Sequence, residues 1–198
     1  MSRRLVITTA LFVALLLLPA ARGAAHITPP VVLVSDRDAL VGLLSGAQRF
    51  FVREVRLSPE QRQAVQKETG SAPDEDFYRF YLGRDGAGRL VAAATFVTDF
   101  TIHGPVRVGV GVGPDGKVKG VTVVEVTEET YAWVKPLIDR HVVHAVVGQD
   151  GRRAIPLAER AAQARLDAMP QFYAQVIAGL VRRAAVLFDV AVVRAGGV

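Results

Sequence analysis

The residues of this chain that could do chemistry lie just before and just after one long valine-rich stretch. They are His103, Gly104, Glu129, Thr130, Tyr131 and Trp133. An imidazole can donate a hydrogen bond or carry a proton near neutral pH. The carboxylate and hydroxyl offer acceptors, and the aromatic rings offer stacking faces. These residue types predict the rim of a binding site. The simpler interpretation is a turn before the stretch and a solvated segment with a packed tryptophan after it.

The stretch between them has the pattern of a β-hairpin. Valines alternate with Arg107, Gly109 and Gly111 over positions 106–112, which is the period of a strand with one buried face. Pro114-Asp115-Gly116 supplies turn chemistry, and a second strand is predicted over 117–126. The glycines also match a dinucleotide-binding string, but that motif must open a helix. Because a second strand follows, the glycines are assigned to the hairpin.

Several other chemistries have no support in the sequence. Cysteine is absent, which excludes disulfides, thiolate metal sites, covalent c-type haem and a cysteine nucleophile. His141 and His144 have helical spacing, but only Asp139 lies close enough to complete a metal site. No serine-histidine-aspartate pattern, carboxylate pair or phosphate loop is present. No catalytic or metal-ligating residue is therefore predicted.

The charge of the chain is weak evidence for any polyanionic partner. The formal net charge is +5, and it falls to +2 without Arg3, Arg4 and Arg22 near the N-terminus. No basic stripe is interleaved with aromatic residues. A nucleic-acid partner is not predicted.

Residues 1–25 have the pattern of a signal peptide. Arg3 and Arg4 precede an apolar run over Leu5–Leu18, and small residues suited to cleavage follow Pro19. We therefore expect export to the periplasm. The alternative is an uncleaved anchor in the inner membrane through residues 5–21, although a span normally needs about 20 apolar residues. Residues 26–198 are expected to form one domain.

The remaining elements predict an α+β domain. A linker is expected over Ile27–Pro30 and a helix over Val31–Val52, capped by Asp36. A second helix is expected from Ser58 to Thr69, where Ser58, Pro59 and Gln61 form a start signal. Strands are predicted over Asp76–Leu82 and Arg89–Phe100. Helices are predicted after Trp133, over Leu157–Ala168, and from Pro170 to about Val190 with Phe172 facing inward. The expected architecture is N-terminal helices, a twisted and mostly antiparallel sheet with a long central hairpin, and C-terminal helices packed on the sheet.

In this order of features the chain resembles the FMN-binding domain family. That family includes flavin-carrying subunits of the sodium-pumping NADH:quinone oxidoreductase and of Rnf-type complexes. The resemblance covers about Leu43 to Leu187. It rests on a few motifs taken together: Leu57-Ser58-Pro59-Glu60-Gln61, the glycine turn at Gly86 and Gly88, the hairpin around Pro114-Asp115-Gly116, Gly120-Val121 in its second strand, and Glu129-Thr130.

The chain departs from the family at the position of covalent flavin attachment. The family's Ser-Gly-Ala-Thr element overlays on Pro170-Gln171-Phe172-Tyr173, and no serine or threonine follows Thr130. The resemblance therefore implies at most a noncovalent FMN. Tyr131 or Trp133 would stack on its ring, His103 would hydrogen-bond to it, and Arg152, Arg153 or Arg160 would meet its phosphate.

The resemblance also implies a partner, a membrane or periplasmic redox protein such as a cytochrome. Two alternatives remain open. The domain is a flavin-free interaction or structural subunit of such a redox complex, which the missing attachment element favours. In a minor third interpretation, His103 is the ligand of a noncovalent haem.

Overall fold

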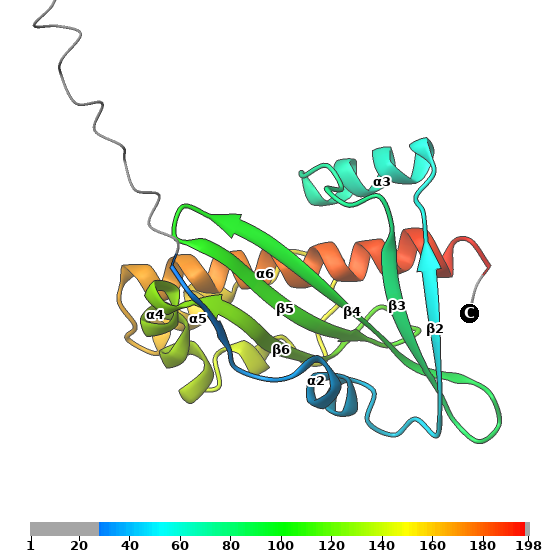
Figure 1. The fold of residues 1–198 in the computed structure, drawn as a ribbon, viewed down its shortest axis with the longest axis horizontal. Coiled ribbons are helices and arrows are strands. Elements are labelled where there is room, and N and C mark those ends of the chain that lie inside the picture. The colour runs from blue at the N-terminus through cyan, green and yellow to red at the C-terminus, as the bar shows by residue number, and fades with distance from the viewer. Residues whose placement is uncertain (1–27, 197–198) are drawn as a thin grey trace, which may run out of the picture.

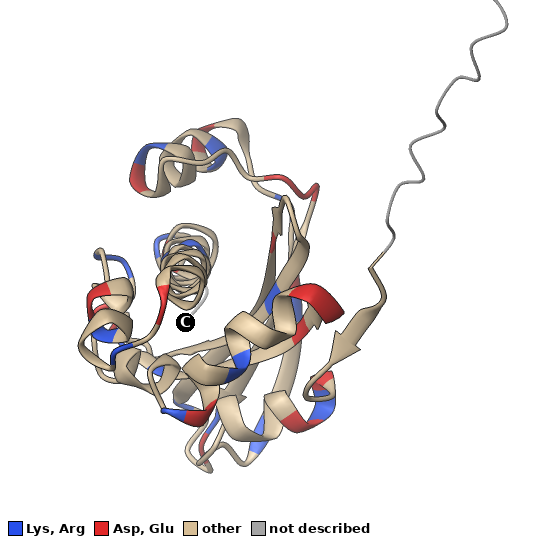
Figure 2. Ribbon diagram, turned by 90° about the vertical axis from the view of Figure 1, so that its left-hand side faces the viewer, with Lys and Arg blue, Asp and Glu red and all other residues tan. Residues whose placement is uncertain are grey.

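A long C-terminal helix, α6 (Ala168–Phe188), lies against a six-stranded antiparallel sheet that curves around it (Figures 1 and 2). The computed structural model describes residues 28–196. The strand order is β1-β6-β5-β4-β3-β2. The strands are β1 (Pro30–Val32), β2 (Arg49–Val55), β3 (Tyr78–Arg84), β4 (Leu90–Thr101), β5 (Gly104–Val112) and β6 (Val118–Thr127). The α+β class is confirmed.

Within residues 28–196, four further α-helices and two short helical segments cover or connect the strands. They are α2 (Asp36–Leu43), α3 (Pro59–Thr69), α4 (Glu128–Asp139), α5 (Leu157–Gln163), the 3-10 helix η1 (Val143–Val146) and the π-helix η2 (Asp189–Val193). The start of α3 is as predicted, because Ser58 and Gln61 form a capping box and Pro59 is the first helical residue. The helix ends at Gly70 in the left-handed conformation.

The central hairpin packs against α6 on one face and against α2 on the other. The valines at 106, 108, 110 and 112 are buried in the main core, which also contains the inner face of α6. On the opposite face α2 approaches so closely that side chains would not fit. A Cβ on Gly109 would lie 3.0 Å from Leu43 Cδ1, and one on Gly111 would lie 2.8 Å from the Leu43 carbonyl oxygen. The alternation of valine and glycine therefore encodes two different packing distances.

The predicted helix over Val31–Val52 is wrong. Only Asp36–Leu43 is helical, and its cap is Ser35, whose hydroxyl accepts from the Asp38 amide, rather than Asp36. Its last four residues belong instead to β2, where aromatic and β-branched residues pair with β3. The expected linker is also partly a strand, since Pro30 and the next two residues pair with β6.

Two expectations for the C-terminal half also need correction. Phe172 is 46% exposed, and Tyr173 is the aromatic residue that faces the core. The inward face of α6 runs through Tyr173, Ala174, Ile177, Leu180, Val181 and Leu187, and Phe172 lies outside it. In addition, the segment from Glu128 to Trp133 is no solvated loop. It forms the first turns of α4, capped by the Thr127 hydroxyl.

Within residues 28–196 no helix is long and apolar enough to cross a bilayer. The expected leader, residues 1–25, lies outside the described residues.

Candidate functional site

The turn between β4 and β5 meets the start of α4 through a buried cluster of hydroxyl groups. The Thr127 hydroxyl donates to the His103 carbonyl oxygen at 2.7 Å and lies 2.8 Å from the Thr130 hydroxyl. The Tyr173 hydroxyl of α6 lies 3.4 Å from the hydroxyls of both Thr101 and Thr130. Thr130 and Tyr173 are fully buried. Each buried hydroxyl therefore has a partner in the protein, and the cluster ties four elements together, β4, β6, α4 and α6.

Gly104 is required by the closeness of β6. Its φ is +102°, and a Cβ at this position would lie 2.3 Å from the Thr127 methyl carbon. No side chain can occupy that space without displacing the Thr127 side chain. Gly104, predicted as a cofactor-binding residue, is therefore a packing position in this structure.

His103 and Glu129 form a pair at the surface of this cluster. Nδ1 of His103 lies 3.0 Å from Oε1 of Glu129. An ionised carboxylate only accepts hydrogen bonds, so Nδ1 carries the proton that is donated to it. In the neutral ring, Nε2 is then left as an acceptor. His103 lies before the hairpin in the sequence and Glu129 lies after it, and the fold brings the two into contact.

Aromatic rings continue from His103 across the start of α6. The His103 ring meets the Trp133 ring edge-to-face with centroids 4.8 Å apart. Trp133 stacks on Tyr173 at 5.7 Å and 15°, and Tyr173 meets Phe172 edge-to-face at 5.2 Å. One face of the Trp133 ring is thus occupied by Tyr173.

Tyr131 points to a different side of α4. It lines a hollow of 340 Å³ together with Leu33, Lys135, Ile138 and His144, among others. Trp133 does not line that hollow. The two aromatic residues predicted to stack on one ring therefore face different surroundings. The described residues also contain no group of three His, Asp or Glu side chains that could hold a metal ion.

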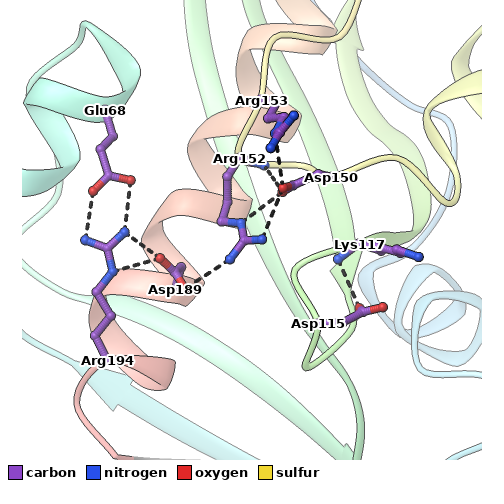
Figure 3. Close-up of polar contacts among 8 residues, drawn as sticks. All are labelled: Glu68, Asp115, Lys117, Asp150, Arg152, Arg153, Asp189 and Arg194. Atoms are coloured by element: carbon purple, nitrogen blue, oxygen red, sulfur yellow. Dashed lines mark hydrogen bonds and ion pairs between the residues drawn. The ribbon is translucent and has the colours of Figure 1, made fainter.

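Arg152 and Arg153 belong to an ion-pair network at the other end of α6 (Figure 3). Both guanidinium groups face Asp150, at 2.9 Å and 3.6 Å. Arg152 also lies 3.7 Å from Asp189, which pairs with Arg194 at 2.6 Å. Hydrogen bonding from Arg152 lowers the pKa of Asp150, and Asp150 in turn raises the pKa of Arg152.

This network is remote from the aromatic row. Asp189 follows Tyr173 by sixteen residues along one helical segment, which corresponds to about 24 Å at 1.5 Å per residue. The structure therefore brings together His103, Gly104, Glu129, Thr130 and Trp133. It does not bring Arg152 or Arg153 to them. Arg160, the third predicted phosphate ligand, is exposed on α5.

A second hollow, of 410 Å³, lies beside Trp133 and was not predicted from the sequence. Pro136, Arg140, Arg165, Leu166, Met169 and Pro170 help to line it. Arg140 donates to the Ala164 carbonyl at 2.5 Å, and within the described part of the chain the guanidinium of Arg165 has no ion-pair partner. Arg165 has a φ of +54°. A positive φ is uncommon for a residue other than glycine, and nothing local in the sequence signals it at this arginine.

No protein-family model, curated protein or solved structure matches the chain. The relation to the FMN-binding domain family accordingly stays a prediction from the motifs.

Proposed function

We propose that this chain is an exported, flavin-free interaction subunit of a membrane-associated redox system. The observation that carries the proposal is that the residues predicted to surround a flavin do not form one site. His103 and Trp133 pack against each other, whereas Arg152 and Arg153 lie in a separate ion-pair network. The predicted leader and the motif resemblance support export and the redox context. The closed arrangement of His103, Thr130 and Trp133 supports an interaction role over a carrier role.

The predicted residues do not fit FMN as one site. A bound flavin needs an accessible aromatic or apolar face and a phosphate site within the length of one ligand. Thr130 is fully buried, and Trp133 already stacks on Tyr173. The guanidinium groups of Arg152 and Arg153 are held by Asp150 at the far end of α6. No single FMN molecule can contact both groups of residues.

The test is the cofactor content of the natively purified chain. We expect no flavin absorbance bands, no quenching of Trp133 fluorescence on addition of FMN, and no FMN-dependent increase in the melting temperature. Trp133 is the only tryptophan of the chain, so its fluorescence reports on this end of the molecule alone. Stoichiometric flavin in the purified protein would overturn the proposal.

The hollow beside Trp133 favours a second candidate function, noncovalent FMN binding at a place the sequence did not indicate. Its volume of 410 Å³ is within the usual range for small-ligand sites, and it offers one aromatic edge with Arg140 and Arg165. The decisive comparison is Arg165→Ser against Arg153→Ser, a matched exposed arginine in the remote network. If FMN binds and only Arg165→Ser weakens it, this candidate replaces the first.

A further inference from the structure

Three large apolar side chains face solvent at one end of the molecule. Ile102 and Phe100, at the β4–β5 turn, are 94% and 76% exposed, and Phe172 lies at the start of α6. Tyr173, the neighbour of Phe172, contacts Thr101 through its hydroxyl, so these side chains share one end of the fold. Figure 1 shows the turn and the start of α6 on the same side. We call Phe100, Ile102 and Phe172 the apolar tip.

The turn that presents the tip is rigidly held. The His103 amide donates to the Thr101 hydroxyl at 3.2 Å, and that hydroxyl donates to the Gly104 carbonyl at 2.9 Å. The His103 carbonyl accepts from Thr127. Ile102 is thus fixed in its exposed position by bonds on both sides. A surface that is ordered in advance loses little conformational entropy when it binds.

The chain enters the domain beside the same tip. Pro30 pairs with Thr127, whose hydroxyl bonds the His103 carbonyl. The Pro29 carbonyl accepts from the Glu128 amide at 3.0 Å. The apolar run Leu5–Leu18 precedes this point by residues 19–27, a stretch that spans at most about 30 Å when fully extended. An anchor formed by the apolar run would therefore keep the tip within about 30 Å of the bilayer.

We propose that the apolar tip inserts into the interfacial region of the membrane and so orients the domain on it. The proposal rests on the membrane-associated role proposed above, and its premise is that residues 5–21 are retained as an uncleaved anchor, the alternative to a cleaved leader. The contact is apolar rather than electrostatic, because Glu128 and Glu129 begin α4 at this end. Attraction to anionic headgroups is therefore weak. Neutral phosphatidylcholine should suffice, and salt should have little effect.

The experiment uses site-specific labels, since the chain has no cysteine. The full chain carrying Ile102→Cys is labelled with an environment-sensitive fluorophore and reconstituted into phosphatidylcholine vesicles. A second series of vesicles contains lipids brominated on the acyl chains, which quench by contact. The matched control is Val52→Cys, an exposed valine of β2 at the far edge of the sheet.

We expect the label at position 102 to shift to shorter wavelength and to be quenched severalfold more than the label at position 52, at low and high salt alike. Replacing both other tip residues, as Phe100→Asp and Phe172→Asp, should abolish the difference while circular dichroism shows an intact fold. Equal quenching at the two positions overturns the proposal. So does a shift that appears only when solubilised membrane proteins are added, because the tip then binds protein. Flavin in the preparation would refute the proposed function without affecting this readout.

Discussion

At the scale of single residues, the turn beside the apolar tip depends on Gly104 for two reasons. Its φ is +102°, and its missing Cβ would overlap the Thr127 methyl group at 2.3 Å. We expect Gly104→Ala to lower the free energy of unfolding by about 3 kcal/mol, from backbone strain plus overpacking. Urea unfolding measures the loss. Gly88→Ala is the control, because Gly88 has a φ of +84° but nothing within 4 Å of its Cβ position. Its loss should be only about 1 kcal/mol, and equal losses would show that the overlap is relieved without cost.

A second residue-scale prediction concerns the pair Asp36 and Arg107. Arg107 donates to both carboxylate oxygens, at 2.6 Å and 2.8 Å, and lies 4.5 Å from the centroid of the Phe96 ring. Hydrogen bonding and charge from Arg107 lower the pKa of Asp36 below its ordinary value of 3.8, against the effect of burial. The stabilisation is therefore present above that ordinary pKa and disappears as the pH falls through the lowered one.

Asp36→Asn should accordingly lose stability at neutral pH, by less than about 1 kcal/mol because the pair is partly exposed. Its thermal stability should also fall less steeply than that of the parent as the pH drops below about 4. Melting temperatures across an acidic pH series test both expectations. Asp76→Asn removes a carboxylate that is mostly exposed and should leave the acid profile unchanged. A variant at Asp36 with the parent's acid profile would contradict the assignment.

At the scale of elements, the sequence predicts best what is decided locally. The capping box of α3 and the turn at Gly116 depend on residues within a few positions of each other. The contact between His103 and Glu129 could also be inferred from the sequence. The two residues flank the hairpin, and the two ends of an antiparallel hairpin must lie side by side. The failures depend on distant partners. Pro30 extends because Thr127 pairs with it. From the sequence alone Arg152 was a candidate phosphate ligand. In the fold its guanidinium forms ion pairs with Asp150 and Asp189.

The edge strand β2 carries the element-scale prediction. It has a neighbour on one side only, and Val52 is 61% exposed next to exposed Phe50 and Phe51. With Val41 of α2 these side chains line an apolar hollow of 410 Å³. An exposed apolar edge tends to pair with other chains. We expect concentration-dependent self-association by light scattering, and Val52→Lys should reduce it. Val32→Lys, on the opposite edge strand β1, is the control. Similar effects of both substitutions would place the association elsewhere.

At the scale of the whole molecule, α6 connects two polar clusters at opposite ends of the core. At its start, Tyr173 completes the hydroxyl cluster under the apolar tip. At its end, Asp189 joins Arg152 and Arg194, and Arg194 reaches Glu68 of α3 at 2.8 Å (Figure 3). The second cluster thus fastens α3 and the loop around Asp150 to the end of the helix. The main apolar core lies between the two clusters, and a smaller apolar cluster lies under α2.

Removing the charge of Asp189 should destabilise the ion-pair cluster at the C-terminal end of α6 without changing the apolar tip. Asp189→Asn leaves two guanidinium groups without their shared carboxylate, and we expect a loss of about 1–3 kcal/mol in the free energy of unfolding. Arg153→Ser, at the exposed margin of the same network, should cost close to nothing. Because the clusters lie about 24 Å apart along α6, the losses from Asp189→Asn and Gly104→Ala should add in the double variant to within about 0.5 kcal/mol. A larger deviation would mean that α6 transmits strain from one end to the other, and the tip could then be altered through the network at Asp189.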